Sequence, residues 1–349
     1  MPASTPSTTS PGFDPLKAAF YGQFVNAAYT MYGSDQNNPL PSPVKLPGNY
    51  DFVAWVQMRD FVFNYGNWTF YGLLAQNPSG ANDYVLAIRG TSNLTEWWDD
   101  LTSMVPWPMP GFGDVGYGFY NIYKTLRIIY RPVPLRAAAV PGAAAAAHES
   151  LEAAGTFADQ VAAAVERHAA EKQAPAAAAA VKKSVTVAAH SLGSALATLY
   201  VAENSQTKKV ITPLLSTLAS PRVGDYSFAS TFDGLGIPSW RIVNELDLVP
   251  KLPIFPFWHI ENEQLYNSGT STWWSLECWH SVDTYLHLLD PKQPLLPACL
   301  PPKLAAAAPL RAAALPRLGA GLVTAAPAEK EVTVTAPAGT TINITIKVG

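Results

Sequence analysis

The spacing of hydrophobic residues changes several times along the chain, and each spacing predicts a different element. An early segment has apolar residues at three- and four-residue steps, which is typical of a helix with one apolar face: Leu16, Phe20, Phe24, Ala27 and Met31. Three runs rich in β-branched and aromatic residues then predict strands: "DFVAWVQMR" at 51–59, "NWTFYGLLAQ" at 67–76 and "DYVLAIRG" at 83–90. The following "GFGDVGYGFYNIYKTLRIIY" predicts a loop that leads into a helix.

Further along, a buried strand is predicted to run directly into a helix. The strand is "SVTVAA" at 184–189, and the helix begins at Leu192 and carries Leu196 and Tyr200. Another helix is expected near 157–168. Two later segments, "ITPLLSTLASP" and "SWRIVNELDLVP", each predict a buried strand that ends in a polar turn. Buried strands that alternate with helices are typical of an α/β fold, with a mostly parallel central sheet flanked by helices on both faces.

Composition divides the chain into a main domain and three outer segments. Ser, Thr and Pro dominate the first residues, and Ala dominates two internal stretches and a later linker, as in disordered or low-complexity segments. The last segment alternates around "APAG", which predicts a β-hairpin. Because a lone hairpin is marginal in water, we expect it to dock on another surface. The predicted divisions are a disordered tail at 1–13, a main domain at 14–302 with Ala-rich insertions or loops at 131–156 and 170–180, a linker at 303–328 and the hairpin at 329–349.

Composition and charge also restrict the functional class. The chain has 349 residues, 48% of them hydrophobic, and a net charge of −3. It can therefore bury a large core, and it lacks the basic excess of a nucleic-acid-binding protein. Its two cysteines, Cys278 and Cys299, are too few for a zinc cluster or a disulfide framework. One bridge and two buried free thiols are both compatible with the sequence.

The sequence shows no recognisable targeting or membrane signal. The first residues lack the positive region and the apolar region of a secretory signal, and no apolar run reaches membrane-spanning length. The default expectation is a soluble, cytoplasmic protein, although a mature secreted chain would look the same. The oligomeric state is left open.

The junction of strand and helix at Leu192 carries a candidate nucleophile. Residues 189–193 read Ala-His-Ser-Leu-Gly, close to the G-x-S-x-G pattern in which a serine occupies a sharp strand-to-helix turn. Ala189 takes the place of the first glycine and is small enough for that position. The first N–H groups of the helix and its dipole would face Ser191 and hold an oxyanion. A helix-capping serine is the alternative, but the flanking strand and helix favour the nucleophile.

A serine nucleophile needs a base, and the base needs an orienting acid, in the chain order Ser, Asp or Glu, His. Asp247 follows directly on a β-branched strand and precedes Leu-Val-Pro, which places it at the carboxyl end of that strand. His280 is the favoured base, because it lies before "SVDTYLHLL" at an expected helix start. The alternatives that the sequence leaves open are Asp225, Asp233, Asp283, Asp290, His259 and His287.

Several stretches together resemble the class 3, or fungal-type, lipases of the α/β-hydrolase superfamily. In order they are "LAIRGTSNLTEWWDDL", "GYGFYNIY", "VAAHSLGSALA", "ASPRVGDYSFA", "RIVNELDLVPKLP" and "HSVDTYLHLL", within residues 84–289. The resemblance implies an α/β-hydrolase fold, a triad of Ser191, Asp247 and His280, and hydrolysis of carboxylic esters through an acyl-enzyme. This serine chemistry needs no metal and no organic cofactor.

The same resemblance implies an oxyanion hole and a lid. The oxyanion donors would be Thr91, in "RGT", and the backbone N–H of Leu192. The lid would be a short helix in "NLTEWWDDL", where apolar residues at helical spacing oppose acidic ones, so that opening exposes aromatic surface to lipid. A surface helix with its aromatics in the core is the alternative. The expected lid and substrate-binding residues are Leu94, Trp97, Trp98, Leu101 and Trp107.

Three features depart from the family pattern: Ala189 in the elbow, Gly116 where the family often has His, and a shorter spacing between Asp247 and His280. The leading hypothesis is a lipase that cleaves acylglycerol esters at a lipid–water interface. The alternatives are an esterase for soluble, aromatic or polymeric esters and a hydrolase-fold binding protein without activity.

Overall fold

The computed structural model describes residues 12–60, 66–80, 82–91, 104–132, 148–172, 182–269, 271–301, 329–335 and 341–347. Several predictions lie outside these residues. They are the tail up to residue 11, the lid positions Leu94, Trp97, Trp98 and Leu101, most of the Ala-rich insertions, and the linker at 303–328. The chain divides into a main unit within residues 1–306 and a second unit within residues 307–349.

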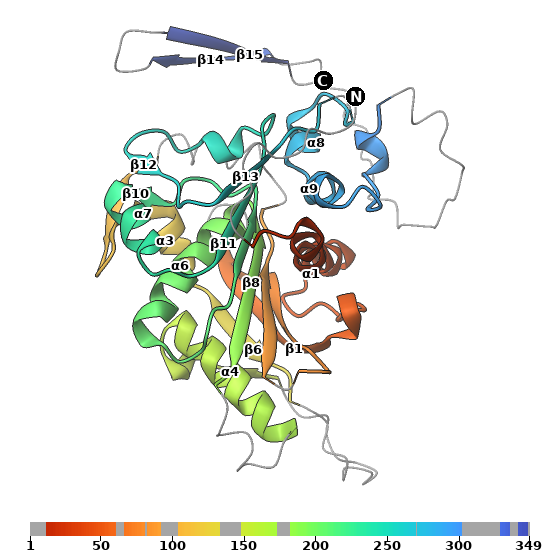
Figure 1. Cartoon of the computed structure of the whole chain (residues 1–349), viewed down its shortest axis with the longest axis vertical. Coiled ribbons are helices and arrows are strands. Elements are labelled where there is room, and N and C mark those ends of the chain that lie inside the picture. The colour runs from red at the N-terminus through yellow and green to blue at the C-terminus, as the bar shows by residue number, and fades with distance from the viewer. Residues whose placement is uncertain are drawn as a thin grey trace. The chain divides into compact units, whose positions relative to one another are not determined.

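The main unit contains both helices and strands (Figure 1). Its α-helices are α1 (Pro15–Ser34), α3 (Tyr117–Tyr123), α4 (Phe157–Lys172), α6 (Leu192–Thr207), α7 (Tyr226–Asp233), α8 (Leu276–His280) and α9 (Val282–Leu289). Its first strands are β1 (Asp51–Asp60), β2 (Asn67–Gln76), β3 (Asp83–Ile88), β4 (Pro106–Met109), β5 (Gly113–Gly116), β6 (Arg127–Tyr130) and β7 (Glu149–Ser150). Its later strands are β8 (Ser184–His190), β9 (Leu215–Leu218), β10 (Gly224–Asp225), β11 (Ser239–Asn244), β12 (Phe257–Trp258) and β13 (Glu263–Tyr266). Short 3₁₀ helices are η1 (Pro47–Asn49), η2 (Glu152–Ala154), η3 (Val249–Lys251) and η4 (Pro297–Cys299).

A nine-stranded sheet forms the centre of the main unit, in the order β13-β11-β9-β8-β3-β2-β1-β6-β7. The strands from β13 to β3 pair in parallel, and β2, β1, β6 and β7 continue the sheet antiparallel. A smaller sheet has the order β12-β10-β5-β4. Because parallel strands end at the same edge, the residues that follow β3, β8 and β11 meet there.

Helices cover both faces of the large sheet and bury an apolar core on each (Figure 1). One core lies beneath α1 and α9, and the other beneath α3, α4 and α6. Along β3, Leu86 and Ile88 point into the second core, whereas Val85 and Ala87 point into the first. Two buried faces explain why this strand is apolar at nearly every position. The predicted α/β architecture with flanking helices is therefore present.

One element was predicted wrongly, and another region holds more structure than expected. The segment after the small sheet does not continue as one helix, because α3 ends at Tyr123 and β6 follows. Ile128 and Tyr130 of β6 are fully buried, and the strand pairs with β1, a partner remote in sequence that local spacing could not reveal. The predicted insertion at 131–156 includes β7 and η2 among its described residues.

The second unit contains the two strands of the predicted hairpin, β14 (Glu329–Thr335) and β15 (Thr341–Lys347). They pair antiparallel, from Glu329 opposite Lys347 to Thr335 opposite Thr341.

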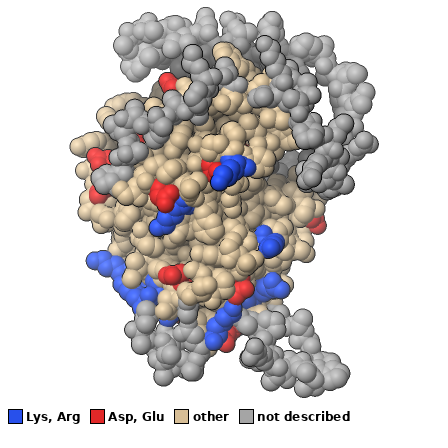
Figure 2. Space-filling view, turned by 45° about the vertical axis from the view of Figure 1, so that its right-hand side comes forward, with Lys and Arg blue, Asp and Glu red and all other residues tan. Residues whose placement is uncertain are grey.

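The surface of the described part carries charges of both signs. On the face shown in Figure 2, Lys and Arg lie among Asp and Glu without a large patch of one sign. None of the described helices is long and apolar enough to cross a membrane.

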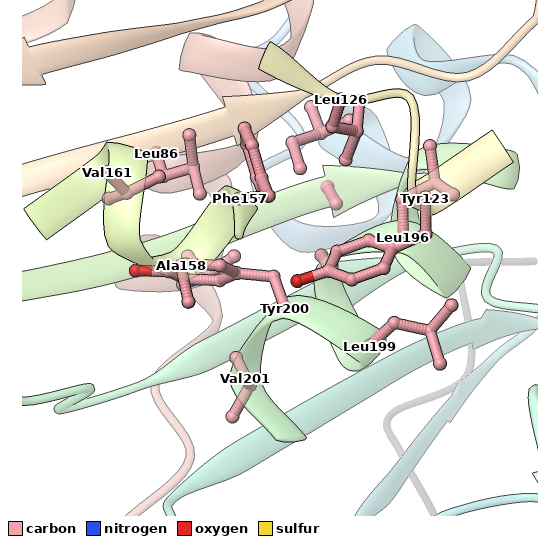
Figure 3. Close-up of a cluster of buried hydrophobic side chains, with 14 of the residues drawn as sticks. Leu86, Tyr123, Leu126, Phe157, Ala158, Val161, Leu196, Leu199, Tyr200 and Val201 are labelled. Carbon is pink, nitrogen blue, oxygen red and sulfur yellow. The ribbon is translucent and has the colours of Figure 1, made fainter. Parts of the chain in front are cut away.

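Two tyrosines, Tyr123 of α3 and Tyr200 of α6, belong to the cluster of buried side chains in Figure 3. They differ in their hydrogen bonding. The Tyr123 hydroxyl donates to Glu203 at 2.6 Å. The Tyr200 hydroxyl is buried and has no hydrogen-bond partner among the described residues. A buried polar group without a partner costs about 1–3 kcal/mol, so the Tyr200 oxygen does not contribute to stability.

We therefore expect Tyr200→Phe to leave the free energy of unfolding unchanged or to raise it by up to about 1 kcal/mol, because it removes only the unpaired oxygen. Tyr123→Phe is the matched control, and it should lower the free energy of unfolding by about 1.5–3 kcal/mol, because it removes a hydrogen bond to a charged group. Urea denaturation monitored by fluorescence measures both. Equal losses in the two variants would contradict the prediction.

Candidate active site

Ser191 occupies a sharp turn between the last residue of β8, His190, and the first residue of α6, Leu192. Its φ of 56° and ψ of −128° lie in a region that non-glycine residues rarely adopt. The residue is only 1% exposed. A serine held in this strained conformation projects from the carboxyl edge of the sheet, as the nucleophile elbow requires.

Two glycines allow this turn to pack directly against the end of β3. A Cβ on Gly193 would lie 2.4 Å from the carbonyl oxygen of Arg89 and 2.5 Å from that of Ile88. Both neighbours are backbone atoms and cannot move aside. A Cβ on Gly90 would lie 2.7 Å from the Cβ of Ser191. Larger residues at either position would push the elbow away from the loop that follows β3.

The structure brings Ser191, His280 and Asp247 into one hydrogen-bonded chain. The Ser191 Oγ lies 2.7 Å from His280 Nε2, and His280 Nδ1 lies 2.7 Å from Asp247 Oδ2. Because an ionised carboxylate only accepts hydrogen bonds, His280 donates from Nδ1, and its Nε2 accepts from the serine hydroxyl. A base in this tautomer can take the proton of the hydroxyl as the oxygen attacks.

Asp247 is held in place by two further donors. It lies in the turn after β11 and is 2% exposed. Tyr285 donates its hydroxyl to Asp247 Oδ2 at 2.8 Å, and the Val249 N–H donates to Oδ1 at 3.0 Å. Burial, followed by the charge of Asp247, raises the pKa of Tyr285 well above its usual value, so the phenol keeps the proton that it donates. These bonds offset the cost of burying the carboxylate.

The alternative acids and histidines have other partners. Backbone N–H groups or an asparagine side chain donate to the four acids, Asp225, Asp233, Asp283 and Asp290. His259 and His287 each donate to a backbone carbonyl, at 2.6 Å and 2.8 Å. Burial lowers the pKa of His259 to about 3, so this ring stays neutral. The structure therefore places none of the six in the hydrogen-bonded chain of Ser191.

The two predicted oxyanion donors belong to segments that adjoin Ser191. Leu192 is the first residue of α6, so its N–H has no partner within the helix and lies at the positive end of the helix dipole. Thr91 follows Gly90 in the loop after β3, and Gly90 packs on Ser191. Their duty as oxyanion donors remains a prediction.

A buried arginine fixes the loop that carries Thr91. Arg89 is 1% exposed, and its guanidinium donates two hydrogen bonds to the Phe70 carbonyl and one, at 2.7 Å, to the Gly90 carbonyl. The guanidinium carbon lies 3.6 Å from the ring centroid of Tyr32 and 4.2 Å from that of Tyr71. The faces of these rings stabilise the buried cation, while its rigid fork holds the Gly90 carbonyl.

His280 lies at the junction of α8 and α9, one residue before Ser281 caps α9. The two cysteines form a bridge, Cys278–Cys299, which decides between the two possibilities left open by the sequence. The Thr284 hydroxyl also donates to the Cys278 carbonyl at 2.6 Å. Because a five-residue helix is not stable on its own, these links hold the segment that carries His280.

Of the five expected lid and substrate-binding residues, Trp107 alone lies among the residues that the structure describes. Trp107 lies on β4, is 44% exposed, and has its ring centroid 5.0 Å from that of Tyr117. The other expected positions, in the lid, lie outside the described residues, so the binding role of all five stays a prediction. Among the residues described, no group of three His, Cys, Asp or Glu side chains could hold a metal ion.

Comparison with known proteins now identifies the family. Residues 85–257 match the family described as lipase (class 3). The chain belongs to the class 3 lipase family. Phospholipase A1-II 4 from Oryza sativa subsp. japonica is 28% identical to this class 3 lipase, over 63% of this chain and 54% of its own. The lipase of Rhizomucor miehei is 34% identical over 30% of this chain and 33% of its own.

Solved structures agree with this assignment of the fold. A triacylglycerol lipase whose catalytic centre is described as a serine protease triad covers 74% of this chain and 82% of its own, with 23% identity and a TM-score of 0.50. The predicted α/β-hydrolase fold of this class 3 lipase is confirmed. The chain spans about half the length of the curated relatives it matches.

Three residues of the candidate site were not identified from the sequence: Tyr29, His190 and Tyr285. His190 adjoins the serine within the quoted elbow, but the motif does not specify its partners. Tyr285 lies in "SVDTYLHLL", and Tyr29 lies among the residues of α1, where nothing in the spacing of apolar positions distinguishes a polar contact from core packing.

The bridge between Cys278 and Cys299 gives a prediction for this class 3 lipase. Replacing both cysteines with serine should lower the free energy of unfolding by about 3 kcal/mol, the value expected for closing a loop of this length, with a sequence separation of 21. The loosened α8 should also slow labelling of Ser191 by a fluorophosphonate probe.

Reduction of the wild type with dithiothreitol should reproduce both effects. The double serine variant serves as the control for the reductant, because dithiothreitol should change it no further. Unfolding curves and labelling rates that do not respond to loss of the bridge would refute the prediction.

Proposed function

We propose that this chain is a serine carboxylester hydrolase, a lipase that cleaves acylglycerol esters through an acyl-enzyme. The observation that carries the proposal is the hydrogen-bonded chain from Ser191 through His280 to Asp247 at the carboxyl edge of the sheet, with 2.7 Å at each step. Membership of the class 3 lipase family supports the same chemistry.

In the proposed reaction, the Ser191 Oγ attacks the ester carbonyl carbon while His280 Nε2 takes the hydroxyl proton. The carbonyl oxygen becomes an oxyanion, which the N–H groups of Leu192 and Thr91 would stabilise. Asp247 keeps the imidazole in the reactive tautomer and stabilises the imidazolium. His280 then gives its proton to the departing alcohol, which leaves an acyl-enzyme.

Deacylation follows the same path with water as the nucleophile. His280 Nε2 takes a proton from the water, the water oxygen attacks the acyl carbonyl, and the proton passes to Ser191 Oγ as the carboxylic acid departs. The same donors hold both tetrahedral intermediates, so one geometry serves both halves of the reaction.

Diacyl phospholipids are a second candidate class of substrate. The observation in favour is that several curated relatives are named phospholipases A1, among them Phospholipase A1-II 4 and Phospholipase A1-II 3 of Oryza sativa. Both candidates place the scissile ester on the same serine and differ only in the group that the binding region must accept.

Ser191→Ala should lower kcat on p-nitrophenyl butyrate by on the order of 10⁴-fold or more, because it removes the nucleophile. Ser194→Ala is the matched control. It removes a buried hydroxyl from the first turn of α6, close to Ser191 in the chain, and that hydroxyl donates to the Leu218 carbonyl. Activity of Ser191→Ala near the wild-type level would refute the proposed mechanism.

The substrate class is tested with the wild type on triacylglycerol emulsions, soluble p-nitrophenyl esters and phosphatidylcholine vesicles. We expect hydrolysis of the triacylglycerol, with a rise in rate above its solubility limit. Preference for phosphatidylcholine would favour the second candidate. A rate confined to soluble esters would contradict both lipid substrates while leaving the ester chemistry intact.

A further inference from the structure

Two polar side chains beside Ser191 take no part in the proposed reaction. They connect the loop after β3 with the main chain of His280. Tyr29 comes from α1, on the core face opposite α6, and His190 directly precedes the nucleophile. The Tyr29 hydroxyl lies 2.8 Å from His190 Nδ1 and accepts the Gly90 N–H at 2.8 Å. The His190 Nε2 lies 2.8 Å from the backbone carbonyl oxygen of His280.

The direction of every bond in this network follows from its two ends. The His280 carbonyl can only accept, so His190 donates from Nε2, and its Nδ1 is left to accept. Tyr29 therefore donates its hydroxyl proton to Nδ1, and its oxygen accepts the Gly90 N–H. Burial lowers the pKa of His190 and raises that of Tyr29. Both groups remain neutral, and the order of donors and acceptors is fixed.

Each end of the network lies next to a group that acts in the proposed reaction. Gly90 immediately precedes Thr91, the predicted oxyanion donor, and its carbonyl is held by Arg89 on the other side. The other end is the main chain of His280, the proposed base. Ser191 lies between them.

We propose that Tyr29 and His190 are positioning residues. They hold the loop of Gly90 and Thr91 and the main chain of His280 in fixed positions on either side of Ser191. The inference rests on the proposed function and adds to it two residues that touch neither substrate nor reacting atoms. The assignment concerns geometry, because neither side chain exchanges a proton with the substrate.

The groups of this network are packed closely together, so a change in one of them displaces the others. A Cβ on Gly90 would lie 2.7 Å from both the Tyr29 oxygen and the Ser191 Cβ, so the tyrosine hydroxyl, the loop and the nucleophile are in direct contact. The rings of His190 and His280 also pack together, with centroids 4.7 Å apart. A shift of the Tyr29–His190 pair is therefore transmitted to the loop and to the base.

The first test compares Tyr29→Phe with the wild type on soluble p-nitrophenyl butyrate. Loss of one hydroxyl should lower kcat by about 10–100-fold, because a displacement of only about 1 Å at the reacting groups can slow a reaction by about 100-fold, and it should change KM by less than about twofold. Tyr21→Phe is the matched control, because it removes a hydroxyl from the same helix outside this network, and it should keep wild-type kcat. A kcat for Tyr29→Phe within about twofold of wild type would overturn the proposal.

The second test separates the donor function of His190 from its volume. In His190→Gln, the side-chain amide can still donate to the His280 carbonyl, whereas His190→Leu fills similar space without a donor. We expect His190→Gln to retain at least about tenfold more kcat than His190→Leu at similar thermal stability. Equal kcat values would show that His190 only fills space and would refute its assignment. This comparison also decides the matter if Tyr29→Phe does not fold.

The coupling of the two residues is tested in the double variant Tyr29→Phe, His190→Leu. Because both belong to one network, the combined loss of kcat should be smaller than the product of the two single losses. A loss equal to the product would mean that the residues act independently, contrary to the proposal.

The proposed function and this inference can fail separately. Retained activity in Ser191→Ala would remove the serine mechanism itself. An inactive Ser191→Ala together with a fully active Tyr29→Phe would leave the mechanism intact and would overturn only the positioning role.

Discussion

The close approach between the first turn of α6 and the end of β3 determines the geometry of the whole site. Gly193 lies so near the carbonyls of Ile88 and Arg89 that a single Cβ would come within 2.5 Å of both. This approach places Leu192 and Thr91 on segments that adjoin Ser191, and the serine between them has a positive φ of 56°. The cost of such a backbone, of order 1–3 kcal/mol, is offset by the large apolar cores on both faces of the sheet.

A second constraint comes from the polar groups that this edge of the sheet buries. Asp247 is almost inaccessible, and an unpaired carboxylate there would be strongly unfavourable. The site resolves this by giving the carboxylate donors from three directions, namely His280, Tyr285 and the Val249 N–H. The same bonds that make the carboxylate tolerable fix the tautomer of His280, so stability and reactivity require the same arrangement.

The sequence predicts the parts of this site that are local and leaves out those that arise from folding. The elbow can be recognised from the sequence because a strand, a serine between small residues and a helix are contiguous in the chain. Asp247 and His280 can be proposed from the sequence because Asp247 follows a predicted strand and His280 precedes a predicted helix. β6 was missed because its partner β1 lies some seventy residues earlier. Tyr29 was missed because a tyrosine hydroxyl within α1 gives no local sign that it will contact His190 and Gly90.

The proposed base lies on the element least able to hold its own position. Ser191 and Asp247 follow strands of the central sheet, whereas His280 ends a helix of five residues, too short to be stable in isolation. Its position therefore depends on links to neighbouring segments. The bridge to Cys299 and the hydrogen bond from Thr284 hold Cys278. The hydrogen bond from His190 holds the carbonyl of His280 itself. Because these links come from separate parts of the chain, the orientation of the imidazole is a property of the assembled fold, which no local motif around His280 can specify.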